Sequence, residues 1–127
     1  MHSNRSLGIY GEKAATSYLE NQGYNIIERN YRCKLGEIDI IAVDGDVIAF
    51  IEVKTRRSEK FCRPGDSVNF AKQKKIIKTA LCFISQKKLT DWMSRFDVVE
   101  VIVDNKEKIE KVTLIKNAFE YSGRLGY

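Results

Sequence analysis

Four charged residues stand at alternate positions in two nearby segments of the chain. Glu37 and Asp39 are two residues apart, and so are Glu52 and Lys54 further along. Side chains alternate between the two faces of a strand, so each pair would share one face of its strand. Carboxylates that are close together repel one another and raise each other's pKa unless a cation lies between them. Oxygen ligands of this kind suit a hard divalent cation such as Mg²⁺ or Mn²⁺.

A divalent cation at such a cluster would supply a defined chemistry. It would polarise a phosphoryl oxygen and lower the pKa of a water molecule. Lys54 would position that water or neutralise the charge that develops. The alternative is a solvated strand face with cross-strand ion pairs, which the spacing alone favours.

A β-hairpin would bring the two pairs together. The runs 37–43 and 47–53 are rich in β-branched residues and flank Asp44-Gly45-Asp46. Asp-Gly between two such runs is a strong hairpin signal.

Two registers of this hairpin are open. A two-residue loop at positions 44–45 would place Asp39 opposite Phe50, whereas a loop at positions 45–46 would place Asp39 opposite Glu52. Either register places the four charged residues on the same face. The opposite face would carry apolar residues suited to a core, namely Ile38, Ile40, Ala49, Ile51 and Val53.

The other elements follow from hydrophobic periodicity and turn signals. The second helix would follow an N-cap at Asp66 or Ser67 and end at about Ser85. The other predicted elements are a helix over 7–22 and strands over 24–30, 96–103 and 111–115. The order α-β-β-β-α-β-β predicts an α/β fold with a mixed central β-sheet flanked by helices.

Two polar residues on the predicted helices could face the carboxylates. Gln73 lies within the apolar arc of the second helix, where an amide needs a partner. That partner could be a carboxylate, a water, a phosphate or, alternatively, the backbone. Glu12 lies at the edge of the first helix's apolar arc and would point either toward the cluster or to solvent.

Composition narrows the function classes. The chain has 127 residues, enough for one domain over 1–127, with residues 1–6 and 121–127 expected to be flexible. His2 is the only histidine, which argues against Ser-His and Cys-His nucleophile systems and excludes a two-histidine zinc site. The three cysteines form no CxxC motif and indicate a reducing cytoplasm. No apolar run approaches the ~18 residues of a membrane span, and the N-terminus lacks a signal-peptide core.

The sequence resembles a known family at these residues. Asp39 followed by Glu52-Val53-Lys54 is similar to the D…ExK core of the PD-(D/E)xK nuclease superfamily. The resemblance is closer still to one bacterial family, the YraN-like proteins, which are related to archaeal Holliday-junction resolvases. It covers nearly the whole chain and includes Gly8, Gly11-Glu12, Glu28-Arg29-Asn30-Tyr31-Arg32, Gly36-Glu37-Ile38-Asp39, Phe50-Ile51-Glu52-Val53-Lys54-Thr55-Arg56, Lys72-Gln73, Arg95-Phe96-Asp97-Val98-Val99 and Asn117-Ala118-Phe119.

The resemblance implies a restriction-endonuclease-like core and a role for each matching residue. Asp39 and Glu52 would be metal ligands, with the Val53 carbonyl as a third, and Lys54 would be the catalytic lysine. Glu12 would complete the site from the first helix. Gln73 would match the glutamine found near the metal in several branches. The implied activity is metal-dependent hydrolysis of phosphodiester bonds in DNA, with branched or structured DNA among the substrates and a homodimer as the acting form.

Basic residues are concentrated beside this cluster. The formal net charge is +5, and residues 53–88 hold 11 Lys and Arg against 2 Asp and Glu. Such residues would grip phosphates without reading sequence. The residues expected to do so are Arg56, Arg57, Lys72, Lys75 and Lys78, with the lysines of the second helix turned away from its apolar arc. Asp97 is expected to pair with a nearby arginine.

Two rival functions stay open. One is a non-catalytic nucleic-acid-binding module on a nuclease fold, and the other is a protein–protein adaptor in DNA processing. Only the nuclease hypothesis requires a divalent-cation site.

Overall fold

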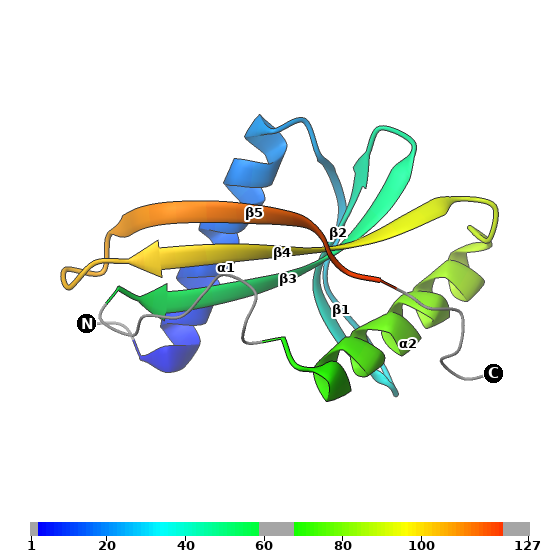
Figure 1. The fold of residues 1–127 in the computed structure, drawn as a ribbon, viewed down its shortest axis with the longest axis horizontal. Coiled ribbons are helices and arrows are strands. Elements are labelled where there is room, and N and C mark those ends of the chain that lie inside the picture. Colours follow the sequence, from blue (N-terminus) through cyan, green and yellow to red (C-terminus); the bar gives the residue numbers. More distant parts are fainter. Residues whose placement is uncertain (1–2, 59–67, 121–127) are drawn as a thin grey trace.

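The computed structural model describes residues 3–58 and 68–120, and the elements follow one another in the predicted order (Figure 1). They are α1 (Asn4–Asn21), β1 (Asn25–Cys33), β2 (Gly36–Asp44), β3 (Val47–Arg57), α2 (Phe70–Lys87), β4 (Met93–Val103) and β5 (Ile109–Phe119). The predicted α/β class is confirmed.

The strands form one mixed sheet. Its order is β1-β2-β3-β4-β5, and all neighbours are antiparallel except β3 and β4, which are parallel. Parallel neighbours require a crossover connection, and α2 lies in the connection between β3 and β4. In the described part of the chain, no helix is both long and apolar enough to cross a membrane.

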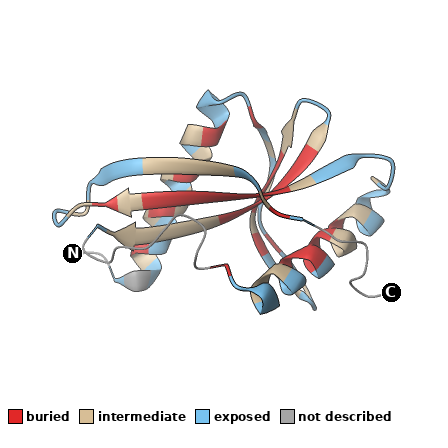
Figure 2. Cartoon of the chain, in the orientation of Figure 1, coloured by how far each residue is buried: buried red, intermediate tan, exposed pale blue. Residues whose placement is uncertain are grey.

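The two helices cover opposite faces of the sheet and create two cores. On the α1 side, Ala15 and Leu19 pack with the strand residues Ile40, Ile51 and Val99. On the α2 side the core includes Ile41, Phe50, Ile77, Phe83 and Val98. Figure 2 shows buried residues along the middle of the sheet and on the inner sides of both helices. Strands β2 and β3 are therefore covered on both faces.

Several element boundaries differ from the predictions. Helix α1 begins at Asn4, because Ser3 caps it by accepting a hydrogen bond from the Ser6 amide, so residues 4–6 belong to a helix and not to a flexible end. The cap of α2 is Asn69, which accepts a hydrogen bond from the Lys72 amide at 2.9 Å. The predicted caps at positions 66 and 67 lie outside the described residues, as does the segment 121–127.

The hairpin takes the second of the two registers. Ile40 pairs with Ile51 and Asp44 pairs with Val47, so the loop consists of Gly45 and Asp46. Gly45 has a φ of +65°, a conformation that glycine adopts without a Cβ penalty.

Strict alternation along β2 is broken next to Asp39, which corrects the predicted apolar face. Ile38 packs in the α2-side core, whereas Ile40 packs in the α1-side core. The pairing of β2 with β3 runs from Asp44 only as far as Ile40. Beyond it, the Val53 amide donates a hydrogen bond to the Asp39 carboxylate at 2.8 Å. The Asp39 side chain, and not a strand carbonyl, thus accepts the hydrogen bond from this β3 amide, and the two strands separate around the carboxylates.

Helix α1 lies unusually close to β3 at one residue. Gly11 is buried against Thr55, and a Cβ added at Gly11 would overlap the Thr55 hydroxyl and lie 2.8 Å from its Cβ. Glycine weakens a helix interior, so its presence here has a packing reason. The close approach brings the neighbouring residue, Glu12, to the strand that carries Glu52.

Gly11→Ala is expected to destabilise the fold by about 2 kcal/mol, because the helix must move away from β3. Thermal or denaturant unfolding measures the change. Gly8→Ala is the matched control, since nothing lies within 4 Å of its added Cβ, and it should stabilise the helix by about 0.5 kcal/mol. Equal stability changes in the two variants would contradict the close approach.

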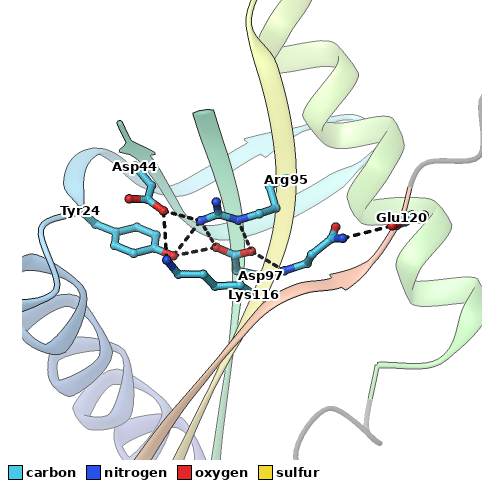
Figure 3. Close-up of polar contacts among 7 residues, drawn as sticks. Tyr24, Asp44, Arg95, Asp97, Lys116 and Glu120 are labelled. Atoms are coloured by element: carbon cyan, nitrogen blue, oxygen red, sulfur yellow. Dashed lines mark hydrogen bonds and ion pairs between the residues drawn. The ribbon is translucent and has the colours of Figure 1, made fainter. Parts of the chain in front are cut away.

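A buried polar cluster joins the hairpin, β4 and β5 on the α1 side of the sheet (Figure 3). Asp97 is fully buried and accepts hydrogen bonds from the Tyr24 hydroxyl, from the Arg95 guanidinium and from the Asn117 amide. Arg95 also contacts Asp44 at 2.8 Å. The expected pairing of Asp97 with an arginine is confirmed.

Candidate metal centre

Two carboxylates lie at the point where β2 and β3 separate, with a cleft on one face of the sheet and a smaller hollow on the other. Asp39 and Glu52 both line a cleft of about 640 Å³ on the α1 side. Both also line a smaller hollow on the α2 side. The cleft is further lined by Arg5, Leu7, Gly8, Ile9, Glu12, Val53, Thr55, Arg56 and Arg57. The hollow is further lined by Gly36, Glu37, Lys72, Lys75 and Ile76.

Asp39 carries an unfavourable charge in this position. Burial, followed by the negative charge of Glu52, raises the pKa of Asp39 to about 7. The hydrogen bond from the Val53 amide opposes this shift without cancelling it. A bound cation would offset both unfavourable contributions.

Glu52 is almost fully buried and contacts two lysines. Its Oε1 atom lies 3.0 Å from Lys72 Nζ and 3.6 Å from Lys54 Nζ. Burial, then the hydrogen bond with Lys72, lowers the pKa of Lys54 despite the attraction of Glu52. Lys54 therefore loses its proton more readily than an exposed lysine does.

Glu12 reaches the same cleft from α1 and has an unsatisfied oxygen. Within the described residues its Oε1 atom is buried with no hydrogen-bond partner, and Arg29 Nη2 lies 3.8 Å from it. Burial raises the pKa of Glu12, and the charges of Glu37 and Glu52 contribute to the increase. A buried carboxylate oxygen without a hydrogen-bond donor is costly and marks a place for a bound cation or water.

Two other predicted site residues have different surroundings. Glu37 lines the hollow, and its side chain is 40% exposed. Its carboxylate lies 3.5 Å from Arg32 on the neighbouring strand. Gln73 donates a hydrogen bond from Nε2 to the Val68 carbonyl at 2.9 Å. The backbone partner considered for Gln73 is therefore present, and the bond secures the start of α2.

A hard divalent cation at this site would need ligands beyond the carboxylates. Asp39 and Glu52 offer carboxylate oxygens and Val53 lies beside them, whereas Glu12 lines the same cleft without completing a three-carboxylate group. Among residues 3–58 and 68–120, no group of three or more His, Cys, Asp or Glu could hold a metal ion by itself. The other ligands would be the Val53 carbonyl, water or substrate phosphate, and Mg²⁺ commonly keeps several waters in this way.

The predicted phosphate-binding residues fall into two groups. Arg56 and Arg57 line the cleft, but their guanidinium groups lie 3.4 Å from Glu100 and Glu107, respectively. Lys75 and Lys78 are exposed on α2. The direction of the Lys72 side chain differs from the prediction, because its ammonium group contacts Glu52 instead of facing away from the sheet.

Sequence reasoning missed one residue of this site and one contact. Arg5 lines the cleft, but it stands before the predicted start of the first helix, so periodicity assigned it to a flexible end. The Ser3-x-x-Ser6 spacing was the available signal, because serine is a favoured N-cap. The contact of Lys72 with Glu52 joins segments distant in sequence, and the sequence carries no local signal for it.

Comparison with known proteins places the chain in a family. Residues 11–101 match the family described as "Uncharacterised protein family UPF0102". The chain belongs to this family. The matched segment includes the Glu12, Asp39, Glu52 and Lys54 positions, and it corresponds to the YraN-like resemblance seen in the sequence.

Relatives in the family align over almost their full length. The chain is 50% identical over 117 residues to a UPF0102 protein of Clostridium tetani, covering 92% of this chain and 96% of the relative. It is 47% identical to a UPF0102 protein of Caldicellulosiruptor saccharolyticus, covering 92% and 99%, respectively. A UPF0102 protein of Clostridium botulinum is 48% identical, with coverage of 94% and 98%.

Proposed function

We propose that this protein is a metal-dependent endonuclease of the PD-(D/E)xK type that hydrolyses phosphodiester bonds in DNA. One observation carries the proposal: Asp39 and Glu52 line the same cleft between α1 and the sheet, where the Val53 amide holds the Asp39 carboxylate by a hydrogen bond of 2.8 Å. Lys54 contacts Glu52 from the same strand. Two carboxylates and a lysine form a site for cation-assisted attack on a phosphate.

Each side chain has a distinct task in this proposal. A divalent cation supplies polarisation of the phosphoryl group and activation of water when it is bound. Asp39 and Glu52 hold the cation position, and the Val53 amide fixes the orientation of Asp39 through its hydrogen bond. Lys54 stabilises the negative charge that develops on the phosphoryl oxygens.

The surrounding basic residues would orient the nucleic acid. Lys75 and Lys78 are exposed on α2, and Lys75 borders the hollow beside the carboxylates. Arg5 borders the cleft on the opposite side. Contacts from such residues to phosphates position a strand without selecting its sequence. This arrangement supports a nucleic acid as the substrate, and the choice of DNA, with branched DNA included, rests on the resemblance of the sequence to the PD-(D/E)xK nucleases.

Lys54→Ala is expected to lower the rate of DNA cleavage by about 10²- to 10³-fold, because it removes a positive charge from the transition state. The assay uses single-stranded, duplex and four-way DNA with Mg²⁺ or Mn²⁺. Lys106→Ala is the matched control, since Lys106 is exposed on the turn between β4 and β5.

The assay also separates the rival functions. A non-catalytic binding module would bind DNA in a salt-dependent way without metal and independently of Lys54. An adaptor would bind neither metal nor DNA. Absence of both cleavage and metal binding in the wild-type protein would refute the proposal.

A further inference from the structure

The contact between Lys72 and Glu52 joins a half-exposed cation to a buried carboxylate. Lys72 Nζ lies closer to Glu52 Oε1, at 3.0 Å, than Lys54 Nζ does at 3.6 Å. The side chain of Lys72 is 38% exposed, whereas that of Glu52 is 10% exposed. The lysine that lies nearest to Glu52 therefore comes from a different layer of the fold and borders solvent.

The backbone of Lys72 is fixed at the start of α2, whereas its side chain is a flexible four-carbon stem that ends at Glu52. Asn69 caps α2 at the Lys72 amide, and Gln73 is bonded to the Val68 carbonyl. These contacts secure the first turn of the helix. The flexible stem of the lysine can still direct the ammonium group elsewhere. One such direction is the hollow that Lys72 itself lines together with Lys75.

An ammonium group and a divalent cation compete for the same carboxylate oxygen. Placed a few ångströms apart in a partly buried site, the two positive charges repel one another strongly. A cation bound by Glu52 would therefore displace Lys72. The displaced ammonium would then face the hollow, where a phosphate of the nucleic acid would be its natural partner.

We propose that Lys72 is a displaceable counter-ion that exchanges Glu52 for a DNA phosphate when a divalent cation binds. The inference rests on the proposed function, because it assigns Glu52 to the cation. This exchange makes metal binding and DNA binding mutually favourable. The metal ion takes Glu52 from Lys72 and frees the lysine for DNA, whereas DNA takes Lys72 from Glu52 and frees the carboxylate for the metal ion. By linkage, DNA raises metal affinity by the same factor by which metal raises DNA affinity.

Calorimetric titration of the full chain with Mn²⁺, with and without a short DNA duplex, tests this exchange. Without DNA, Lys72→Met is expected to bind Mn²⁺ about 10-fold more tightly than the wild type, because Glu52 loses the nearer of its two lysine partners among the described residues and keeps only Lys54. DNA is expected to raise wild-type affinity about fivefold or more and to raise that of Lys72→Met by a clearly smaller factor, because only the wild type also gains from the release of Lys72. Gel analysis after each titration verifies that the duplex is intact.

Two further variants serve as controls. Lys74→Met removes a charge from the same helix but from an exposed position that does not line the hollow, and it should bind Mn²⁺ as the wild type does. Lys72→Arg keeps the charge and should preserve the competition. Unchanged or weaker Mn²⁺ binding by Lys72→Met, in a protein with a native circular dichroism spectrum, would overturn the exchange and leave the proposed function standing. Absence of Mn²⁺ binding in both the wild type and Lys72→Met would overturn both.

Discussion

Asp39→Asn is expected to lower the affinity for Mg²⁺ or Mn²⁺, and the rate of DNA cleavage, by at least about 100-fold. Loss of an outer-shell partner of a metal site costs about 10- to 100-fold, and loss of a charged ligand costs more. The substitution is nearly isosteric, and the asparagine oxygen can still accept the hydrogen bond from the Val53 amide. Calorimetric metal titration and the cleavage assay measure the two losses.

The same substitution is expected to stabilise the metal-free protein above neutral pH. The pKa of Asp39 is raised from 3.8 to about 7, chiefly by burial and then by Glu52, so the folded state binds this proton more tightly than the unfolded state. The free energy of unfolding therefore falls as the pH rises between these two values. Above pH 7 the ionised carboxylate costs at most about 4 kcal/mol.

Unfolding in the presence of a chelator measures this effect. Asp39→Asn should be more stable than the wild type by about 1 to 3 kcal/mol at pH 8 and should have almost no advantage near pH 4. A stabilised variant without activity also shows that the lost activity is not caused by misfolding. A variant that is less stable than the wild type at pH 8 would contradict the unfavourable charge on Asp39.

Asp97→Ala is expected to destabilise the protein by about 3 kcal/mol or more. Asp97 is fully buried and accepts four hydrogen bonds, two of them from Arg95 (Figure 3). Its removal leaves the Tyr24 hydroxyl and the Asn117 amide without this acceptor and Arg95 with less counter-charge. Breaking a buried ion pair by removing one partner has a cost of this size.

Denaturant unfolding with a two-state analysis measures the loss of stability, and two further variants serve as comparisons. Tyr24→Phe removes one donor to Asp97 and should cost about 1 kcal/mol. Asp44→Ala removes the more exposed partner of Arg95 and should cost less than Asp97→Ala. Equal losses in Asp44→Ala and Asp97→Ala would show that burial of Asp97 does not determine its contribution.

The polar cluster around Asp97 and the candidate metal centre contain carboxylates of two kinds. Those of the first kind stabilise the fold, and those of the second are candidates for a function. Asp97 has donors on both oxygens, and they tie β4, β5 and the α1–β1 connection together. Glu12 has a buried oxygen for which the described part of the chain supplies no donor, and burial raises the pKa values of Glu12 and Asp39. Carboxylates that the protein itself leaves unsatisfied are the better candidates for binding an external cation.

The local pattern of the sequence was enough to predict the central hairpin. Asp-Gly between two β-branched runs specifies a tight turn, and a turn limits the register to two choices. Asp39 and Glu52 then lie close together in either register. For the same reason, hydrophobic periodicity predicted the order of the seven elements, because each period depends only on neighbouring residues.

Only the tertiary structure decided what surrounds the carboxylates. Packing of Gly11 against Thr55 brings Glu12 to the cleft, and the start of α2 brings Lys72 to Glu52. Both contacts join helices to a strand distant in sequence, so no local pattern encodes them. Helices on both faces bury Glu52 within the fold, whereas alternation alone could equally describe a solvated face. The sequence therefore determined which acidic residues meet, and the packing of the helices determined their burial, their partners and their pKa values.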